Sequence, residues 1–184
     1  MDERIEKELV SLLPRFRRFA LGLARNPSDA DDLVQTAMEK AVSRIDQWEP
    51  GTRLDSWVFR IIQTTHIDQI RGKKRNDRFL EVVENNAQRS HDGERAVEAR
   101  SSLDAVRHAI FNLPEEQRSV IMLVSVEGLS YKEAAETLGI PMGTLTSRLV
   151  RGRNALMHML GSPEGDGSKS ADFNNLHLEK GAMK

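Results

Sequence analysis

The sequence predicts an all-α protein built from two small helical domains that are joined by a flexible linker. Apolar residues recur every three to four positions along residues 5–70 and again along 99–160, which is the spacing of one helical face. Between these stretches the periodicity is lost, and Asn, Gln, Ser, Asp and Gly become frequent, which is typical of a linker. We therefore expect domains at 1–76 and 99–160, a linker at 77–98 and a disordered tail at 161–184.

The composition excludes several classes of function. The 184 residues include no cysteine, so disulfides and thiolate metal sites are impossible, and a reducing compartment, the cytoplasm, is favoured. No apolar run reaches the roughly 18 residues of a membrane helix, and the charged N-terminus is not a secretory signal. The histidines lack the spacing of metal ligands, and no nucleophile–base pair or phosphate-binding loop is present, so we expect no metal, no cofactor and no enzyme activity.

Charge is sorted along the chain although the net charge is only −1. Residues 53–78 contain seven basic residues against three acidic ones, whereas 79–104 contain six acidic residues against three basic ones. Sorting of this kind predicts separate surfaces for separate partners.

Three helices are expected in the first domain. The first covers residues 5–23 and ends at Asn26–Pro27. Ser28 is expected to cap the second, whose first turn carries three aspartates that the helix dipole favours. After a turn at Trp48–Gly51, Thr52 and Asp55 resemble a capping box at the start of the third helix, which continues through Ile70 into the basic run.

The second domain ends in a predicted helix-turn-helix. It begins with a helix near Ala99 and another that opens at Pro114–Glu116 and closes at Gly128. Ser130 and Glu133 then form a capping box, Gly139 is a C-terminal stop, and Pro141 fits the first turn of a last helix. The order helix, tight turn, helix is typical of a DNA-reading unit.

The last helix has the composition of a DNA reader. Residues 142–160 contain no Asp or Glu but three arginines, and a stripe of Leu145, Leu149, Leu156 and Met159 is expected to be buried. Small hydroxyls and arginines on its exposed face suit base edges and phosphates in a major groove. The candidate DNA contacts are Thr144, Thr146, Ser147, Arg148 and Arg151. The alternative is a plain antiparallel helix pair with a solvated basic face.

Six segments in this order resemble the extracytoplasmic-function (ECF) group of bacterial sigma factors, within the sigma-70 family. Together they extend the resemblance over about residues 9–160, and Gly51–Trp57 also resembles the α-proteobacterial general-stress subgroup. The six segments are Ala30–Gln35, Arg53–Ile62, Ile67–Arg71, Leu113–Arg118, Gly128–Ala135 and Gly143–Arg148.

The resemblance implies three binding surfaces. Asp31, Asp32 and Gln35 fall where the family grips the clamp helices of RNA polymerase, although the aspartates also suit a purely capping role. The last helix falls where the family reads the minus-thirty-five element; some members carry Arg where Thr146 stands, so we expect a different target sequence.

The third helix falls where the family melts and reads the minus-ten element. Melting requires a basic surface for the DNA backbone and a pocket for an extruded base. The resemblance places the pocket loop at Gln63, Thr64, Thr65 and His66, where many members have Asn in place of Thr64; Trp57 is expected to lie in the core. The basic surface would come from Arg60, Arg71, Lys73, Lys74 and Arg75.

The implied partners are core RNA polymerase, promoter DNA and an anti-sigma factor. The polymerase would be contacted at the clamp helices of its largest subunit and at the flap of its second-largest subunit, by a chain that is monomeric when free. Two other functions remain open. A conventional helix-turn-helix regulator would need a dimerisation or sensor element, which is not visible, and a sigma mimic that only sequesters an anti-sigma factor would have no use for the basic residues.

Overall fold

The structure is a computed structural model, which describes residues 2–81 and 102–161, with the side chains of residues 73–81 and 102 left out. The predicted linker is wrong over residues 77–81, which continue the third helix, and its remainder lies outside the described residues. The predicted tail beyond residue 161 lies outside them as well. The side chains of Lys73, Lys74 and Arg75 lie outside them as well.

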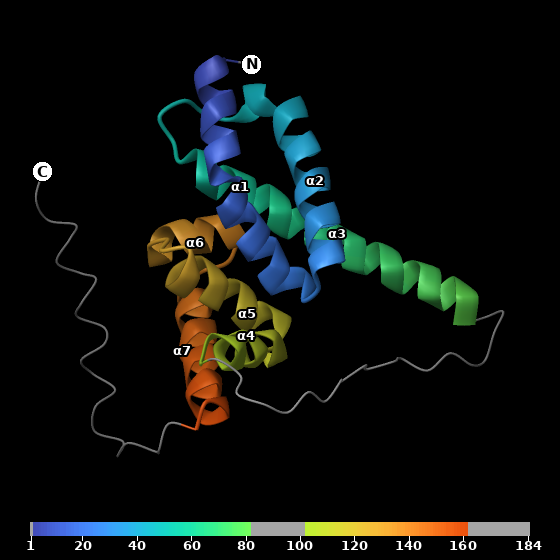
Figure 1. The fold of residues 1–184 in the computed structure, drawn as a ribbon, viewed down its shortest axis with the longest axis vertical. Coiled ribbons are helices and arrows are strands. Elements are labelled where there is room, and N and C mark those ends of the chain that lie inside the picture. Colours follow the sequence, from blue (N-terminus) through green and yellow to red (C-terminus); the bar gives the residue numbers. More distant parts are fainter. Residues whose placement is uncertain (1, 82–101, 162–184) are drawn as a thin grey trace, which may run out of the picture.

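The predicted all-α class is confirmed: every regular element among the described residues is helical (Figure 1). The first module contains α1 (Glu3–Ala24), α2 (Pro27–Ser43), the 3₁₀ turn η1 (Ile45–Gln47) and α3 (Leu54–Glu81). The second contains α4 (Ser102–Asn112), α5 (Glu115–Ile121), the π-helical turn η2 (Met122–Val126), α6 (Tyr131–Leu138) and α7 (Met142–Met159). No helix within residues 2–81 and 102–161 is long and apolar enough to cross a membrane.

The first module is a three-helix bundle around an aromatic cluster. Phe59 of α3 meets Phe16 and Phe19 of α1 edge to face, with ring centroids 5.4 and 5.1 Å apart, and all three side chains are fully buried. Such edge-to-face pairs add to the free energy gained from apolar burial. Trp57 packs half-buried against the same core, which confirms its predicted place. The C-terminal part of α3 projects away from the bundle (Figure 1).

Two predicted helix caps are wrong. α2 begins one residue before Ser28, and its N-cap is Asn26, whose side chain accepts a hydrogen bond from the Asp29 amide. Asn is as good an N-cap as Ser, and Pro27 then occupies the first turn, where its missing N–H is not needed. The Thr52–Asp55 capping box does not form, because the Thr52 hydroxyl donates to the Glu49 carbonyl and Asp55 binds arginines.

The helix-turn-helix is confirmed together with its local signals. The Ser130 hydroxyl and the Glu133 carboxylate cap α6 reciprocally, and Gly139 ends it with a φ of 64°. Pro141 is the N-cap of α7, and Leu145 and Leu149 are buried as expected. The prediction holds only in part toward the end of the helix, because Leu156 is half-buried against the core and Met159 is 41% exposed.

The two modules pack directly against each other and share one continuous apolar core. In Figure 1 the second module lies below the first, against the C-terminal end of α1 and the part of α3 that precedes its projecting end. The contact is close at Gly22 of α1, where an added Cβ would lie 2.8 Å from the Met122 side chain. The Glu127 amide donates to the Met122 carbonyl at 2.9 Å, and this widened turn carries Glu127 toward the first module.

Arg118 joins the modules from inside the core. Its side chain, 2% exposed, donates to the carbonyls of Leu113 at 2.7 Å, Phe111 at 3.3 Å and Leu23, near the end of α1, at 3.4 Å. Burial, reinforced by the nearby charge of Arg25, lowers its pKa to about 10. The guanidinium satisfies carbonyls at two helix ends, where the helix dipole favours a cation.

Arg118→Ala is expected to lower the free energy of unfolding by about 2–4 kcal/mol, because buried carbonyls lose their donor and a cavity remains. Urea denaturation followed by circular dichroism measures the change. Arg107→Ala, which removes an exposed arginine from α4, is the matched control and is expected to stay within about 0.5 kcal/mol of the wild type. Equal stabilities of the two variants would contradict the role of Arg118.

Candidate functional site

The predicted polymerase-binding residues share the exposed face of α2. Asp31 lies 3.1 Å from Arg17 in an ion pair that is mostly exposed on both sides. Asp32 is exposed, and the Gln35 amide donates to Glu39 at 3.2 Å. Asn26 caps the helix, so neither Asp31 nor Asp32 serves as its N-cap.

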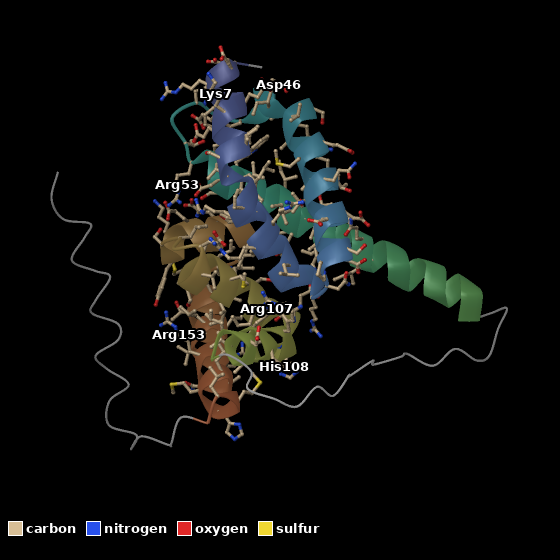
Figure 2. All side chains as sticks on the ribbon, viewed as in Figure 1. Lys7, Asp46, Arg53, Arg107, His108 and Arg153 are labelled. Carbon is tan, nitrogen blue, oxygen red and sulfur yellow. The ribbon has the colours of Figure 1, made fainter. Side chains whose placement is uncertain are left out.

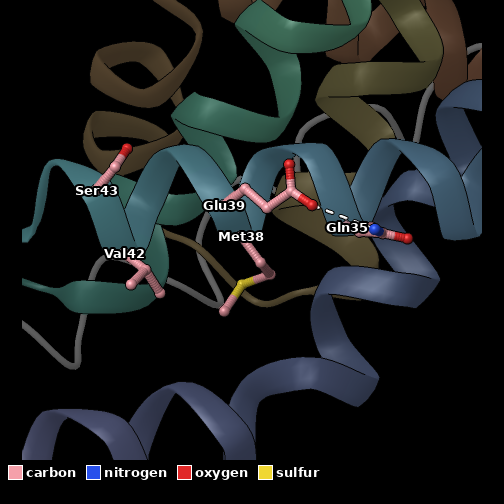
Figure 3. Close-up of a pocket in the computed structure, with 5 residues that line it drawn as sticks. All are labelled: Gln35, Met38, Glu39, Val42 and Ser43. Atoms are coloured by element: carbon pink, nitrogen blue, oxygen red, sulfur yellow. Dashed lines mark hydrogen bonds between the residues drawn. The ribbon is translucent and has the colours of Figure 1, made fainter.

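An apolar hollow continues the same face of α2. It is lined by Gln35, Met38, Glu39, Val42 and Ser43 (Figure 3). Val42 is 45% exposed, and Met38 is half-buried. Carboxylates at one end of a helix face and apolar side chains at the other suit a partner helix that is basic at one end and apolar at the other.

The predicted minus-ten residues divide into two groups on α3. Arg60, Thr64 and Arg71 are exposed, whereas Gln63, Thr65 and His66 are buried. The predicted pocket loop is wrong: α3 runs unbroken from Leu54 to Glu81, so residues 63–66 are helical. The apolar spacing of Ile62, Ile67 and Ile70 continues across them, so the helix has no reason to break there.

The buried group faces neighbouring helices. Thr65 accepts a hydrogen bond from Lys40 of α2 at 3.1 Å. His66 Nε2 lies 3.6 Å from a carboxylate oxygen of Glu115 in the second module. Gln63 lines a cavity between the modules together with Leu138, Ile140 and Arg148.

The predicted minus-thirty-five residues lie along the N-terminal half of α7. Thr146 and Ser147 donate their hydroxyl protons to carbonyls of the same helix, at 3.0 Å each, and Arg151 is exposed. Arg148 lies 2.8 Å from Glu116 of α5, and its side chain is only 21% exposed. This face of α7 therefore presents hydroxyl groups and the exposed Arg151, whereas the guanidinium of Arg148 is paired with Glu116.

A buried ion-pair network joins the modules, and the sequence analysis missed it. The fully buried Glu127 carboxylate accepts from Arg15 Nε at 3.0 Å and from Arg18 Nε and Nη2 at 2.7 and 2.9 Å. Arg15 also donates to the Glu127 carbonyl and to Asp55. The only signal in the sequence is a lone acidic residue after the apolar run 120–126.

Arg53, which Figure 2 shows where the first module meets α6, extends the same network through Asp55. It donates to Asp55 at 2.6 and 3.0 Å and to Glu133 of α6 at 2.9 Å. Burial opposes ionisation of Asp55 and of Glu133, but hydrogen bonds to each carboxylate outweigh it, and the pKa of each lies below its ordinary value. The hydrogen bond with Asp55 raises the pKa of Arg53.

Comparison with known families decides what the two modules are. Sigma-70 region 2 matches residues 9–76, and sigma-70 region 4 matches residues 103–156. ECF RNA polymerase sigma factor SigW of Bacillus subtilis (strain 168) is 33% identical over 145 residues, which cover 73% of this chain and 77% of that protein. The chain belongs to the ECF sigma factors of the sigma-70 family.

Further relatives agree in sequence and in fold. ECF RNA polymerase sigma factor EcfG of Rhodopseudomonas palustris (strain TIE-1) is 29% identical to this sigma factor over 160 residues, which cover 87% of each chain. The sigma factor RpoE from Bartonella quintana, solved in complex with the anti-sigma factor NepR, superimposes with a TM-score of 0.74 at 31% identity, covering 88% of this chain and 99% of RpoE.

The Arg53 network predicts a pH dependence of stability. Because the pKa values of Asp55 and Glu133 are lowered below 3.8 and 4.5 in the folded sigma factor, the stabilisation is complete above those ordinary values and is lost as the pH falls through the lowered ones. Arg53→Gln is therefore expected to lower the free energy of unfolding by about 1 kcal/mol near pH 7, since the pair is partly exposed.

Urea denaturation at several pH values measures this difference. It should be constant above about pH 5 and should shrink below about pH 4, where both carboxylates of the wild type also become protonated. A difference between the wild type and Arg53→Gln that persists unchanged to pH 2 would show that the network does not stabilise the fold through these carboxylates.

Proposed function

We propose that this ECF sigma factor binds core RNA polymerase, directs it to one class of promoters and helps to melt them, without itself catalysing a reaction. The observation that carries the proposal is the separation of two surfaces on one chain: an acidic and apolar face on α2, and a basic helix-turn-helix ending in α7. We assign 1–81 to polymerase and minus-ten binding, 82–98 to the linker and 99–160 to minus-thirty-five recognition.

The α2 face is proposed to dock on the clamp helices of the polymerase. Asp31 and Asp32 would pair with arginines of the partner, and Gln35 would add a neutral hydrogen bond. Met38 and Val42 would supply the apolar part of the contact. The flap of the second-largest subunit is the proposed partner of the second module.

The DNA contacts are proposed to divide between α3 and α7. Arg60 and Arg71 would follow the backbone around the minus-ten element, with Lys73, Lys74 and Arg75 extending the basic surface. On α7, the Thr146 methyl suits a thymine in the major groove, and Arg148 and Arg151 suit guanine or phosphate. Gln63, Thr64, Thr65 and His66 would contact the extruded base.

Control by an anti-sigma factor is proposed from a relative of the same fold. RpoE from Bartonella quintana was solved in complex with the anti-sigma factor NepR, and the present chain covers nearly all of RpoE. A partner of that kind would cover the α2 face and the second module together. The site of action is the cytoplasm, where the polymerase works, and the free chain is proposed to be monomeric.

In vitro transcription tests the function directly. Purified core polymerase is incubated with a genomic promoter library, with and without this sigma factor. Specific new transcripts that require the chain are expected, and their start sites define the promoter. Tight binding to core polymerase without transcripts would favour a sigma mimic, and a stable dimer that does not bind core polymerase would favour a conventional regulator.

The double variant Arg148→Ala/Arg151→Ala is expected to weaken promoter binding by the holoenzyme. Each lost phosphate contact should reduce the slope of log K against log salt by about 0.9, and each lost base contact should weaken binding by about 1–3 kcal/mol. Promoter binding is measured by fluorescence anisotropy at several salt concentrations. Binding to core polymerase should be unchanged, and Arg107→Ala is the matched control from the same module.

The double variant Asp31→Arg/Asp32→Arg is expected to show the opposite pattern. Like charges opposite the arginines of the clamp helices should weaken binding to core polymerase at least tenfold, because charge reversal adds repulsion to a lost pair. Competition against the wild type for core polymerase measures the loss. If affinity for core polymerase is unchanged in a folded variant, the α2 assignment is wrong.

A further inference from the structure

The cavity between the two modules has the size of a small-molecule site. Its volume is about 290 Å³, and side chains of α3 line it together with side chains of α5 and of the helix-turn-helix. This volume lies at the lower end of the range of ligand pockets. It equals the share of roughly ten water molecules in the liquid, which leaves room for a molecule of about six to ten non-hydrogen atoms.

A buried acceptor in the wall of this cavity lacks a donor. Gln63 of α3 is 8% exposed, and its side-chain oxygen is buried without a hydrogen-bond partner among the residues that the structure describes. A buried amide oxygen without a partner raises the free energy of the folded chain, so a ligand that donates to it gains affinity. The cavity therefore favours a ligand with a strong hydrogen-bond donor.

Two more acceptors line the cavity from α5. The Ser119 hydroxyl, in a residue only 2% exposed, donates its proton to the Glu115 carbonyl at 2.9 Å, so its oxygen is left to accept. The Glu115 carboxylate is half-buried and lies 3.6 Å from His66 Nε2. Arg148 and Glu116, which complete the polar part of the wall, are paired with each other at 2.8 Å. The wall thus offers three acceptors, one of which is a carboxylate.

The remaining side chains of the wall are apolar. Ile67 of α3, Leu138 at the end of α6 and Ile140 in the turn before α7 are each half-buried and line the cavity. An alkyl chain that covers them gains affinity by leaving water. A purely ionic ligand would gain nothing from these three side chains, and a purely apolar ligand would leave the three acceptors without donors.

We propose that this cavity binds a small primary alkylamine, in its ammonium form, between α3 and the second module. A primary ammonium has three N–H donors and no acceptor, which matches the oxygens of Gln63, Ser119 and Glu115. A chain of about five carbons fills the rest of the volume against the apolar wall. An anion would meet the Glu115 carboxylate and be repelled.

The bound amine adds to the stability of the packed modules, because it contacts both of them. At ten times its dissociation constant, the amine should raise the melting temperature of the chain by about 3–6 °C. The proposal concerns a ligand outside the proposed function and does not depend on the roles of α3 and α7 in DNA binding.

A titration followed by nuclear magnetic resonance tests the site. Pentylamine is the probe, and pentanol, which has the same chain with a hydroxyl in place of the ammonium, is its neutral counterpart. Each is added to the full chain labelled with ¹³C at its isoleucine methyl groups. Ile67 and Ile140 report on the cavity, and Ile5 of α1 does not line it.

Saturable shifts of Ile67 and Ile140 are expected with pentylamine, and Ile5 should not move. Six non-hydrogen atoms in a fitted site should give a dissociation constant of about 0.1–1 mM. Pentanol should bind at least fivefold more weakly, because it has one donor and no charge.

Two variants of the wall locate the amine. Gln63→Leu and Ser119→Ala each remove one acceptor, and each is expected to weaken pentylamine binding at least fivefold. Gln35→Leu makes the same change as Gln63→Leu at an exposed position of α2 and is the matched control, which should bind as the wild type does. Circular dichroism shows which variants are folded, and Ser119→Ala, the smaller change, carries the test if Gln63→Leu is not.

Three results would overturn the proposal. The absence of a saturable shift with pentylamine would show that the cavity holds only water. Equal affinities for pentylamine and pentanol would show that the cavity selects an apolar chain and not an ammonium. Wild-type affinity in the folded wall variants would place the bound amine elsewhere on the chain.

Discussion

The arrangement of this sigma factor depends on one buried carboxylate. Glu127 stands at the end of the π-helical turn η2, and its fully buried side chain is neutralised by Arg15 and Arg18 of α1. A carboxylate without these partners would be strongly destabilising at that depth, so the second module is stable in this position only against α1. Met122 against Gly22 and Arg118 against the end of α1 then follow from the same approach of the two modules.

The same packing divides the functional surfaces into an accessible one and a covered one. The α2 face keeps the carboxylates of Asp31 and Asp32 and the apolar side chain of Val42 exposed. The α3 residues Gln63 and His66 are buried beside the second module, and Arg148 of α7 is paired with Glu116 of its own module.

Local signals predicted the elements well where one short-range interaction dominates. The capping box of Ser130 and Glu133, the left-handed Gly139 and the apolar stripe of α7 need no tertiary partner to be recognised. The predicted caps are wrong where a second nearby interaction was possible. Asn26 caps α2 in place of Ser28, and the Asp55 carboxylate accepts hydrogen bonds from arginines instead of capping α3. The expected pocket loop came from the family resemblance, whereas the apolar period of α3 continues through it.

The sequence alone determined the all-α class and the helix-turn-helix, because helical periodicity and capping are properties of neighbouring positions. The candidate binding residues on α2 and α3 were implied by the family resemblance. Only the tertiary structure decided that the two modules pack on each other and that Gln63 and His66 are buried between them. It also decided that Arg148 is paired with Glu116. Ion pairs such as Arg18–Glu127 join residues 109 positions apart, and no local pattern specifies which distant charge will neutralise a buried one.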